Sequence, residues 1–404
     1  MVRNLYQSLL NHLSKKEFTI LTGARQTGKS TLMRELERHC KTSGVPSVFL
    51  NLENKALLSE LDATPLNLLP YLPVTEQRIV VFVDEIQYLN NPSNFLKLLF
   101  DEYSDRLKIV ATGSSAFYLD RSFTDSLAGR KRIFHLPTCN FEEHLQLRAK
   151  DELLDEILRI RANEGAKTLS INLLQQEYEQ FLLYGGYPAV ITEPDLKEKQ
   201  AMLAEIRDSF VKKDILESGV RNEKEFYNLF RLLASQSANL LNVSEISNTL
   251  GIKHETISRY LNILQKCFHI VQVSPFYRNL RKELTKMPKV YLLDTGLMNS
   301  LLNNFQPLSE RLNNGDIWET ACYKALYTGY GEEEVFYWRT ADGNEVDFVL
   351  PNIEKPFAVE IKYSQTAFKA SKYRMFSETY SDIPLSCNYF QPFTEDFFRR
   401  NLSV

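Results

Sequence analysis

The chain has 404 residues, which is too long for one ordinary hydrophobic core and indicates about two to four domains. Hydrophobic residues make up 44% and charged residues 25%, so collagen-like, low-complexity and wholly disordered chains are excluded. The 48 Lys and Arg nearly balance the 51 Asp and Glu, giving a net charge of −3, so any nucleic-acid surface must come from local segregation of charge.

The chain shows no targeting or membrane signal. Its apolar runs are short, as at 79–83, whereas a membrane-spanning helix needs about 20 apolar residues. The first residues turn polar again at Asn11 and lack both a signal-peptide core and a small-residue cleavage site. The five cysteines are odd in number and far apart, which favours reduced thiols over disulfides or a thiolate metal site. We therefore expect a cytoplasmic protein with no membrane association.

A phosphate-binding loop is predicted near the N-terminus. Residues 17–22 predict a short buried strand, and 32–40 predict a helix. Between them lies the pattern G-x-x-x-x-G-K-S, whose backbone N–H groups bind phosphate oxygens at a helix N-terminus. Lys29 would reach the β and γ phosphates of ATP, and the Ser30 hydroxyl would contact Mg²⁺. The predicted nucleotide-binding residues are Gly23, Ala24, Arg25, Gln26, Thr27, Gly28, Lys29, Ser30 and Thr31.

Two adjacent carboxylates follow a second buried strand. Residues 79–83 form a β-branched apolar run, typical of a central parallel strand, and end at Asp84 and Glu85. Asp84 would hold Mg²⁺ through water, and Glu85 would polarise the water that attacks the γ-phosphate. Such a pair alone could be a solvated strand end. Its place 55 positions after Lys29 (84 − 29) indicates ATP hydrolysis.

Three further strands are predicted at 46–51, 107–112 and 132–136, and they alternate with helices. This pattern predicts an α/β fold with a doubly wound parallel sheet. Ser114, just beyond the strand at 107–112, could sense the γ-phosphate. Arg130 is a candidate for the guanidinium that neutralises transition-state charge, in cis or from a neighbouring subunit; a plain surface arginine is the alternative.

With these residues the chain resembles the AAA-type branch of P-loop ATPases, on the segments 23–31, 79–85 and Gly113-Ser114-Ser115. It is similar in particular to a bacterial and archaeal family that joins such an ATPase to a C-terminal domain described as of unknown function. The segments LYGGYP at 183–188 and VYLLDTG at 290–296 are typical of that family. The resemblance covers essentially the whole chain and implies nucleotide-dependent conformational work. Related ATPases often form rings, so a homo-oligomer is left open.

The middle of the chain predicts a winged-helix domain. Gly185, Gly186 and Pro188 mark a boundary, and 195–219 predicts an amphipathic helix. Residues 242–264 then read as helix, Gly turn and second helix, a helix-turn-helix pattern. Residues 253–289 hold eight Lys or Arg against two Glu, or +6. Double-stranded DNA is one predicted partner and protein docking is the alternative. The candidate DNA contacts are Lys253, Arg259, Arg278, Arg281 and Lys282.

The C-terminal part predicts a hairpin at 338–350, a strand at 357–362 and a helix at 317–326. These elements carry Glu319, Asp347, Glu360 and Lys362, an arrangement that resembles the PD-(D/E)xK core of restriction-endonuclease-like nucleases. The resemblance implies a small α/β domain in which Asp347 and Glu360 hold Mg²⁺ and Lys362 helps to activate water. Cleavage, a fold retained for binding, and the polar face of an ordinary edge strand all stay open at this point.

The predicted organisation has three parts. These are an AAA-type ATPase domain with a helical extension at 1–190, a helical and winged-helix domain at 191–300, and a restriction-endonuclease-like domain at 301–404. The expected function is ATP binding and hydrolysis with Mg²⁺, coupled to DNA, with nuclease activity of the last domain undecided. The alternative is an ATP-dependent signalling or scaffold protein whose later domains bind a protein partner.

Overall fold

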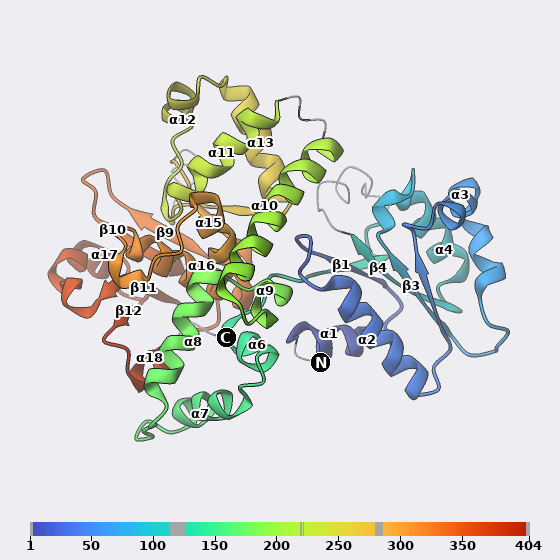
Figure 1. The fold of residues 1–404 in the computed structure, drawn as a ribbon, viewed down its shortest axis with the longest axis horizontal. Coiled ribbons are helices and arrows are strands. Elements are labelled where there is room, and N and C mark those ends of the chain that lie inside the picture. The colour runs from blue at the N-terminus through green and yellow to red at the C-terminus, as the bar shows by residue number, and fades with distance from the viewer. Residues whose placement is uncertain (1–2, 114–126, 219, 221, 279–285, 401–404) are drawn as a thin grey trace. The chain divides into compact units, whose positions relative to one another are not determined.

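The computed structural model describes residues 3–113, 127–218, 220, 222–278 and 286–400. The chain divides into two compact units (Figure 1). The first spans Met1–Pro137 with Lys266–Phe268, and the second spans Thr138–Gln265 with His269–Val404. The first boundary therefore lies well before the predicted position 190, and no compact unit begins near 301. The reason is that the helices of residues 138–218 pack with the C-terminal part of the chain.

The first unit is built on a five-stranded sheet with the order β2-β3-β4-β1-β5, in which every neighbouring pair is parallel. Figure 1 shows β1, β4 and β3 side by side in blue and teal. The strands are β1 (Phe18–Thr22), β2 (Ser47–Asn51), β3 (Ile79–Asp84), β4 (Leu107–Gly113) and β5 (Lys131–His135). The helices are α1 (Leu5–His12), α2 (Lys29–Thr42), α3 (Lys55–Ala63) and α4 (Pro92–Tyr103), with 3₁₀ turns η1 (Pro65–Tyr71) and η2 (Ile86–Tyr88).

Successive strand residues of this sheet face two different hydrophobic clusters. In β3, Val81 packs in one cluster with residues of α3 and α4, whereas Val80 and Phe82 pack in the other with residues of α1 and α2. Because side chains alternate between the faces of a strand, both faces of the sheet are covered by helices. The predicted α/β fold with a parallel sheet is confirmed.

The second unit begins with helices and continues with two small sheets. Its helices are α6 (Phe141–Leu147), α7 (Asp151–Ala162), α8 (Ile171–Tyr184), α9 (Pro188–Thr192), α10 (Leu196–Ser218), α11 (Glu223–Ser235), α12 (Val243–Leu250), α13 (His254–Lys266), α15 (Thr295–Leu302), α16 (Asn314–Tyr330), α17 (Arg374–Thr379) and α18 (Glu395–Arg400). Short 3₁₀ turns are η4 (Leu308–Glu310), η5 (Glu332–Glu334), η6 (Gln365–Ala367) and η7 (Ala370–Tyr373).

One sheet has the order β6-β8-β7, with β6 (Asn239–Leu240), β7 (Ile270–Val273) and β8 (Lys289–Leu292). The other has the order β12-β11-β10-β9, with β9 (Phe336–Arg339), β10 (Glu345–Leu350), β11 (Phe357–Ser364) and β12 (Leu385–Gln391). Helix α16 packs on β11. Since β8 is the middle strand of its sheet, Lys289 is held between Leu240 and Val273.

The two glycine-containing segments that the sequence singled out meet inside the second unit. The Gly186 amide donates a hydrogen bond of 2.8 Å to Asp294, whose other carboxylate oxygen caps α15 at Leu297. A Cβ on Gly186 would lie 2.3 Å from the carbonyl oxygen of Cys139, and one on Gly296 would lie 2.2 Å from that of Tyr184. Only glycine allows these backbones to approach so closely.

None of the five cysteines forms a disulfide. Within the described part of the chain, none of the helices combines the length and the apolarity of a transmembrane span.

Candidate functional site

The loop between β1 and α2 has the backbone geometry of an anion-binding turn. Gly23, Gln26 and Gly28 all have positive φ angles, of 150°, 60° and 93°. Gly23 cannot be replaced, because a Cβ there would lie 2.3 Å from the Leu136 carbonyl oxygen. The loop leads directly into α2, which begins at Lys29, so the helix N-terminus faces the loop.

Side chains hold this loop in shape. The Lys29 ammonium donates to the carbonyl oxygens of Gly23 and Ala24, at 2.9 and 2.7 Å. The Thr27 hydroxyl donates to Ala24, and the buried Arg3 guanidinium donates to the Thr27 carbonyl at 2.6 Å. The role of Arg3 could not be read from the sequence, because it lies 24 positions before Thr27 in an unremarkable segment.

The predicted metal-binding residues lie together. The Ser30 hydroxyl donates to an Asp84 carboxylate oxygen at 3.1 Å, and the Thr112 hydroxyl donates to the same oxygen. Thr112 also accepts the backbone N–H of Glu85 at 3.0 Å. A hydroxyl and a carboxylate oxygen at the end of a parallel strand fit Mg²⁺, which prefers few protein ligands and completes its shell with water and phosphate. Thr112 is a positioning residue that the sequence reasoning missed, although it ends the predicted strand.

Glu85 occupies a left-handed backbone conformation, with φ 60° and ψ 50°. For a residue other than glycine this conformation costs about 1–3 kcal/mol, and such strain is concentrated at functional sites. The Glu85 carboxylate accepts a hydrogen bond from the side-chain amide of Gln87. Nearby, at the end of β5, burial lowers the pKa of His135 to about 3, helped by the charges of Lys29 and Arg3.

Arg130 does not lie with these residues. It precedes β5, and its carbonyl accepts the N–H of Phe18 at the start of β1, so it is at the sheet edge opposite the loop. Its guanidinium makes two contacts with Asp101, at 2.6 and 3.2 Å. A role in cis is therefore wrong, because the length of β1 separates Arg130 from the loop. A role in trans stays a prediction. Ser114 lies outside the described residues.

A second cluster forms in the C-terminal part and contains all four predicted residues. Asp347 on β10 and Glu360 on β11 are 4% exposed. The Asp347 carboxylate accepts the N–H of Ile361 at 2.8 Å, and the Glu360 carboxylate accepts the N–H of Asp347 at 3.3 Å. The Lys362 ammonium donates to Glu360 and lies 3.8 Å from Asp347.

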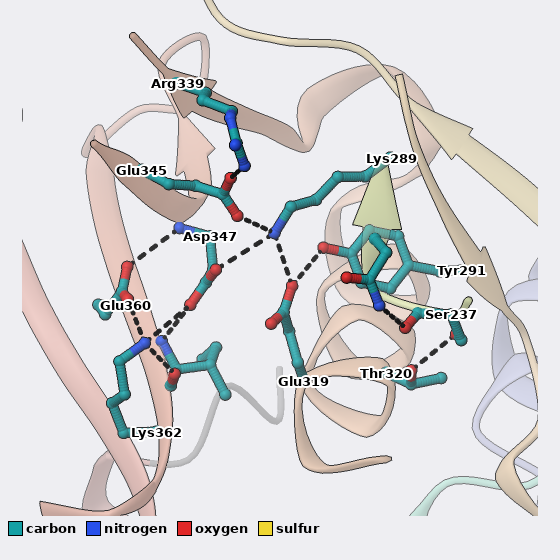
Figure 2. Close-up of polar contacts among 12 residues, drawn as sticks. Ser237, Lys289, Tyr291, Glu319, Thr320, Arg339, Glu345, Asp347, Glu360 and Lys362 are labelled. Carbon is teal, nitrogen blue, oxygen red and sulfur yellow. Dashed lines mark hydrogen bonds and ion pairs between the residues drawn. The ribbon is translucent and has the colours of Figure 1, made fainter. Parts of the chain in front are cut away.

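Glu319 reaches this cluster from α16, but a residue that was not predicted lies at the centre. The Lys289 ammonium lies 2.9 Å from Glu319, 2.5 Å from Glu345 and 3.2 Å from Asp347, as Figure 2 shows. The Tyr291 hydroxyl also donates to Glu319. Lys289 is the last residue of the basic segment 253–289. Its side chain is only 3% exposed, so it does not contribute to a basic surface.

The electrostatics follow from burial and mutual charge. Burial raises the pKa of Glu319 to about 8 and that of Glu360 to about 7, and the charge of Asp347 adds to both rises. Burial alone would lower the pKa of Lys289, but Glu319 and the neighbouring acidic groups hold it well above its usual value. The ammonium therefore stays protonated at neutral pH.

This second cluster does not fit Mg²⁺ in the arrangement described. The Lys289 ammonium already contacts the carboxylates of Glu319, Glu345 and Asp347 at 2.5–3.2 Å, longer than the Mg²⁺–oxygen distance of about 2.0–2.1 Å. Among the described residues, no group of three or more His, Cys, Asp or Glu side chains is arranged to hold a metal ion. The resemblance to restriction-endonuclease-like nucleases implies that Asp347 and Glu360 bind a metal ion. In this structure their carboxylates pair with lysines instead.

The basic segment of the middle part is only partly available. Lys253, which directly precedes α13, and Arg259 on α13 are both exposed. Arg278 is exposed but pairs with Asp382 at 2.7 Å. Arg281 and Lys282 lie outside the described residues.

Family models match the chain in three successive segments. Residues 15–145 match an AAA domain, 175–308 match a domain of unknown function (DUF8612), and 314–401 match another domain of unknown function (DUF4143). The first segment contains the sheet, the loop and the carboxylate pair described above. The first unit therefore contains a segment that is similar to an AAA domain.

Among curated proteins, the chain is similar to an uncharacterized protein of Haemophilus influenzae, 26% identical over 91% of this chain and 86% of the relative. An uncharacterized protein of Mycobacterium tuberculosis is 25% identical over 90% and 74%. Solved structures similar to this chain include Orc1 of Aeropyrum pernix in complex with DNA. It has 13% sequence identity and a TM-score of 0.30, and the similarity covers 74% of this chain and 91% of that chain. AMPPCP-bound DnaA from Aquifex aeolicus has 15% identity and a TM-score of 0.29, over 65% and 86%.

Proposed function

We propose that this protein binds and hydrolyses ATP with Mg²⁺ at the loop of the first unit. The observation that carries the proposal is the meeting of Ser30 and Asp84, which come from separate elements, beside Lys29. Ser30 and Asp84 would hold Mg²⁺, which supplies positive charge against the phosphates when bound.

The chain's own residues have distinct tasks in this proposal. The backbone N–H groups of 23–28 and the start of α2 bind phosphate oxygens. Lys29 exchanges its contacts with the Gly23 and Ala24 carbonyls for phosphate oxygens. Thr112 fixes the positions of the Asp84 carboxylate and the Glu85 backbone through its hydroxyl group. The Glu85 carboxylate orients the attacking water.

The test is ATP hydrolysis by the full chain, with and without EDTA, for wild type and Asp84→Asn. Asp105→Asn is the matched control, because Asp105 is exposed and pairs only with surface groups such as Lys16. We expect Asp84→Asn to abolish Mg²⁺-dependent turnover and Asp105→Asn to retain it. Equal turnover in the two variants would contradict the assigned site.

We further propose that the segment 223–292 is a winged helix that binds double-stranded DNA. The order α11, β6, α12, α13, β7, β8, with a three-stranded sheet, supports the fold. The exposed side chains of Lys253, just before α13, and Arg259 on α13 support phosphate contact. Lys253→Ala with Arg259→Ala should weaken duplex binding and reduce the salt dependence of the affinity. Unchanged affinity would favour the alternative role, docking of a protein partner.

Metal-dependent cleavage by the C-terminal part does not belong to the function proposed here. The order of α16, the hairpin of β9 and β10, β11, α17 and β12 supports a restriction-endonuclease-like fold, but Lys289 holds the acidic groups. Plasmid incubated with Mg²⁺ should stay intact with wild type. Nicking that is lost in Asp347→Ala would restore the nuclease hypothesis.

A homo-oligomer stays a prediction, and it would allow Arg130 to act in trans. Sedimentation of the full chain with and without nucleotide tests it. A monomer in both conditions would remove the remaining role of Arg130 in catalysis.

A further inference from the structure

The acidic cluster of the second unit contains its own cation. We propose that the Lys289 ammonium takes the position that a divalent metal would hold among Glu319, Glu345 and Asp347, so that this cluster binds metal only when Lys289 is removed. This inference concerns the second unit alone and does not depend on ATP hydrolysis.

The Lys289 ammonium is surrounded by carboxylates in the way that a bound cation would be. Three carboxylates from two elements, α16 and β10, point at one nitrogen at 2.5–3.2 Å (Figure 2). An ammonium group has three N–H donors, and the Lys289 ammonium hydrogen-bonds to Glu319 and Asp347 and pairs with Glu345. These three carboxylate contacts distinguish Lys289 from a lysine that is open to a substrate.

The backbone holds Lys289 in this position. It lies in the middle strand of the β6-β8-β7 sheet, paired on both sides. Tyr291, two residues further along β8, projects from the same face and donates to Glu319 at 2.7 Å. The lysine therefore reaches the carboxylates from a strand whose own hydrogen bonds do not depend on them.

The charges of the cluster are nearly balanced without metal. Four carboxylates, those of Glu319, Glu345, Asp347 and Glu360, face three cations. Two are lysines, and the third is Arg339, which donates to Glu345 at 2.6 Å. The excess negative charge is at most 4 − 3 = 1, which is less than the charge of a divalent ion. Metal added to this buried site would bring excess positive charge into a region of low dielectric, which is unfavourable.

The carboxylate oxygens on the β11 side are also engaged. Glu360 accepts from Lys362 and from the Tyr373 hydroxyl, and Asp347 accepts from the Ile361 N–H. A metal would have to displace Lys289 to gain oxygen ligands from Glu319, Glu345 and Asp347, and would have to displace Lys362 as well only to gain one from Glu360. Removal of Lys289 alone frees the carboxylates of Glu319, Glu345 and Asp347 together.

The experiment is a titration of the full chain with Mn²⁺, followed by electron paramagnetic resonance of the free ion. All proteins carry Asp84→Asn, so that the first unit does not contribute. The proteins compared are this background, the same with Lys289→Met, and the same with Lys289→Met and Asp347→Asn. Met is nearly as long as Lys and has no charge.

We expect the background protein to bind no Mn²⁺ that depends on Asp347. Lys289→Met should bind a single ion and should regain, on adding Mn²⁺, the thermal stability that it loses in EDTA. Binding should disappear again with Asp347→Asn. A folded Lys289→Met variant that binds no Mn²⁺ would overturn the proposal.

The wild-type residue provides a second measurement, which is decisive if Lys289→Met fails to fold. Asp347→Asn is introduced into the Asp84→Asn background with Lys289 intact. If the background protein binds Mn²⁺ and this change abolishes the binding, Lys289 does not exclude metal and the proposal is wrong. If neither protein binds Mn²⁺, the exclusion stands.

Discussion

The two carboxylate sites of this protein differ in what neutralises them. In the first unit, Asp84 receives hydroxyl donors from Ser30 and Thr112, and the nearby Lys29 donates to backbone carbonyls. In the second, the carboxylates receive ammonium donors directly, above all from Lys289. The hydroxyl donors leave the negative charge of Asp84 uncompensated for an incoming cation, whereas the lysines compensate the charges of the second cluster. The same residue types thus give the proposed Mg²⁺ site in one unit and a closed ion network in the other.

The largest effect that tests this difference between the two sites is expected at Glu85. We expect Glu85→Gln to lower the rate of ATP hydrolysis by about 10²–10⁴-fold, because the variant loses the group that orients water, while ATP binding is retained. Hydrolysis and fluorescent-nucleotide binding are measured together. Glu102→Gln, an exposed change on α4, is the control. Parallel loss of binding and hydrolysis would point to misfolding instead.

Lys29→Met should lower hydrolysis by about 10²–10³-fold and also weaken ATP binding, since the charge that clamps the phosphates is lost. Lys41→Met on the same helix removes a lysine that pairs with Glu37 at the surface, and it should change neither quantity. The measurements are the same two assays. Normal hydrolysis by Lys29→Met would mean that the loop does not bind the triphosphate.

In the second unit, Tyr373→Phe tests how tightly the network is built. The variant loses the hydroxyl that donates to the buried Glu360, and the free energy of unfolding should fall by about 1.5–3 kcal/mol. Tyr71→Phe loses a hydroxyl that donates to Glu60 at an exposed site and should cost far less. Urea unfolding followed by circular dichroism measures both. Equal losses would contradict a specially stabilised cluster.

Lys108 is a second buried lysine, but unlike Lys289 it has no carboxylate ion pair among the described residues. Burial lowers its pKa to about 7, and its ammonium contacts His12 and the carbonyls of Lys15 and Glu17. Between pH 7 and the usual lysine pKa of 10.5, the unfolded chain holds a proton that the folded chain lacks. Stability of the first unit should therefore rise with pH, by up to about 1.4 kcal/mol per pH unit.

The Lys108→Met variant should lack this rise. Hydrogen exchange of β4 amides in wild type and variant, converted to opening free energies at each pH, provides the measurement. Identical slopes would mean that Lys108 keeps its proton in the folded chain, as Lys289 does.

The first site could be predicted almost completely from the sequence, because its parts are local. The strand predicted at 17–22 appears as β1 (Phe18–Thr22), and that at 79–83 appears as β3 with Asp84 at its end. In both cases the functional residues follow directly from an apolar run. Thr112 was missed, although a hydroxyl at a strand end beside two carboxylates is a usable signal.

The second site was predicted only in part. Glu319, Asp347, Glu360 and Lys362 do come together, but Lys289 was assigned to a basic surface. Its partners lie 30 to 58 positions away, so its burial depends on tertiary packing rather than on any neighbouring residue. The one local hint is that a lysine begins the apolar strand of β8. The unit boundary at Pro137 was missed for the same reason.

The contact between Gly186 and Asp294 has a consequence for synthesis on the ribosome. Its two partners are 108 residues apart, and translation adds about 5–20 residues per second, so the earlier one emerges about 5–20 seconds before the later. During that interval the nascent first unit has all five strands of its sheet, while the helices that follow still lack the segment that completes their packing. We expect the newly made chain to be most open to chaperones and proteases between residues 138 and 218.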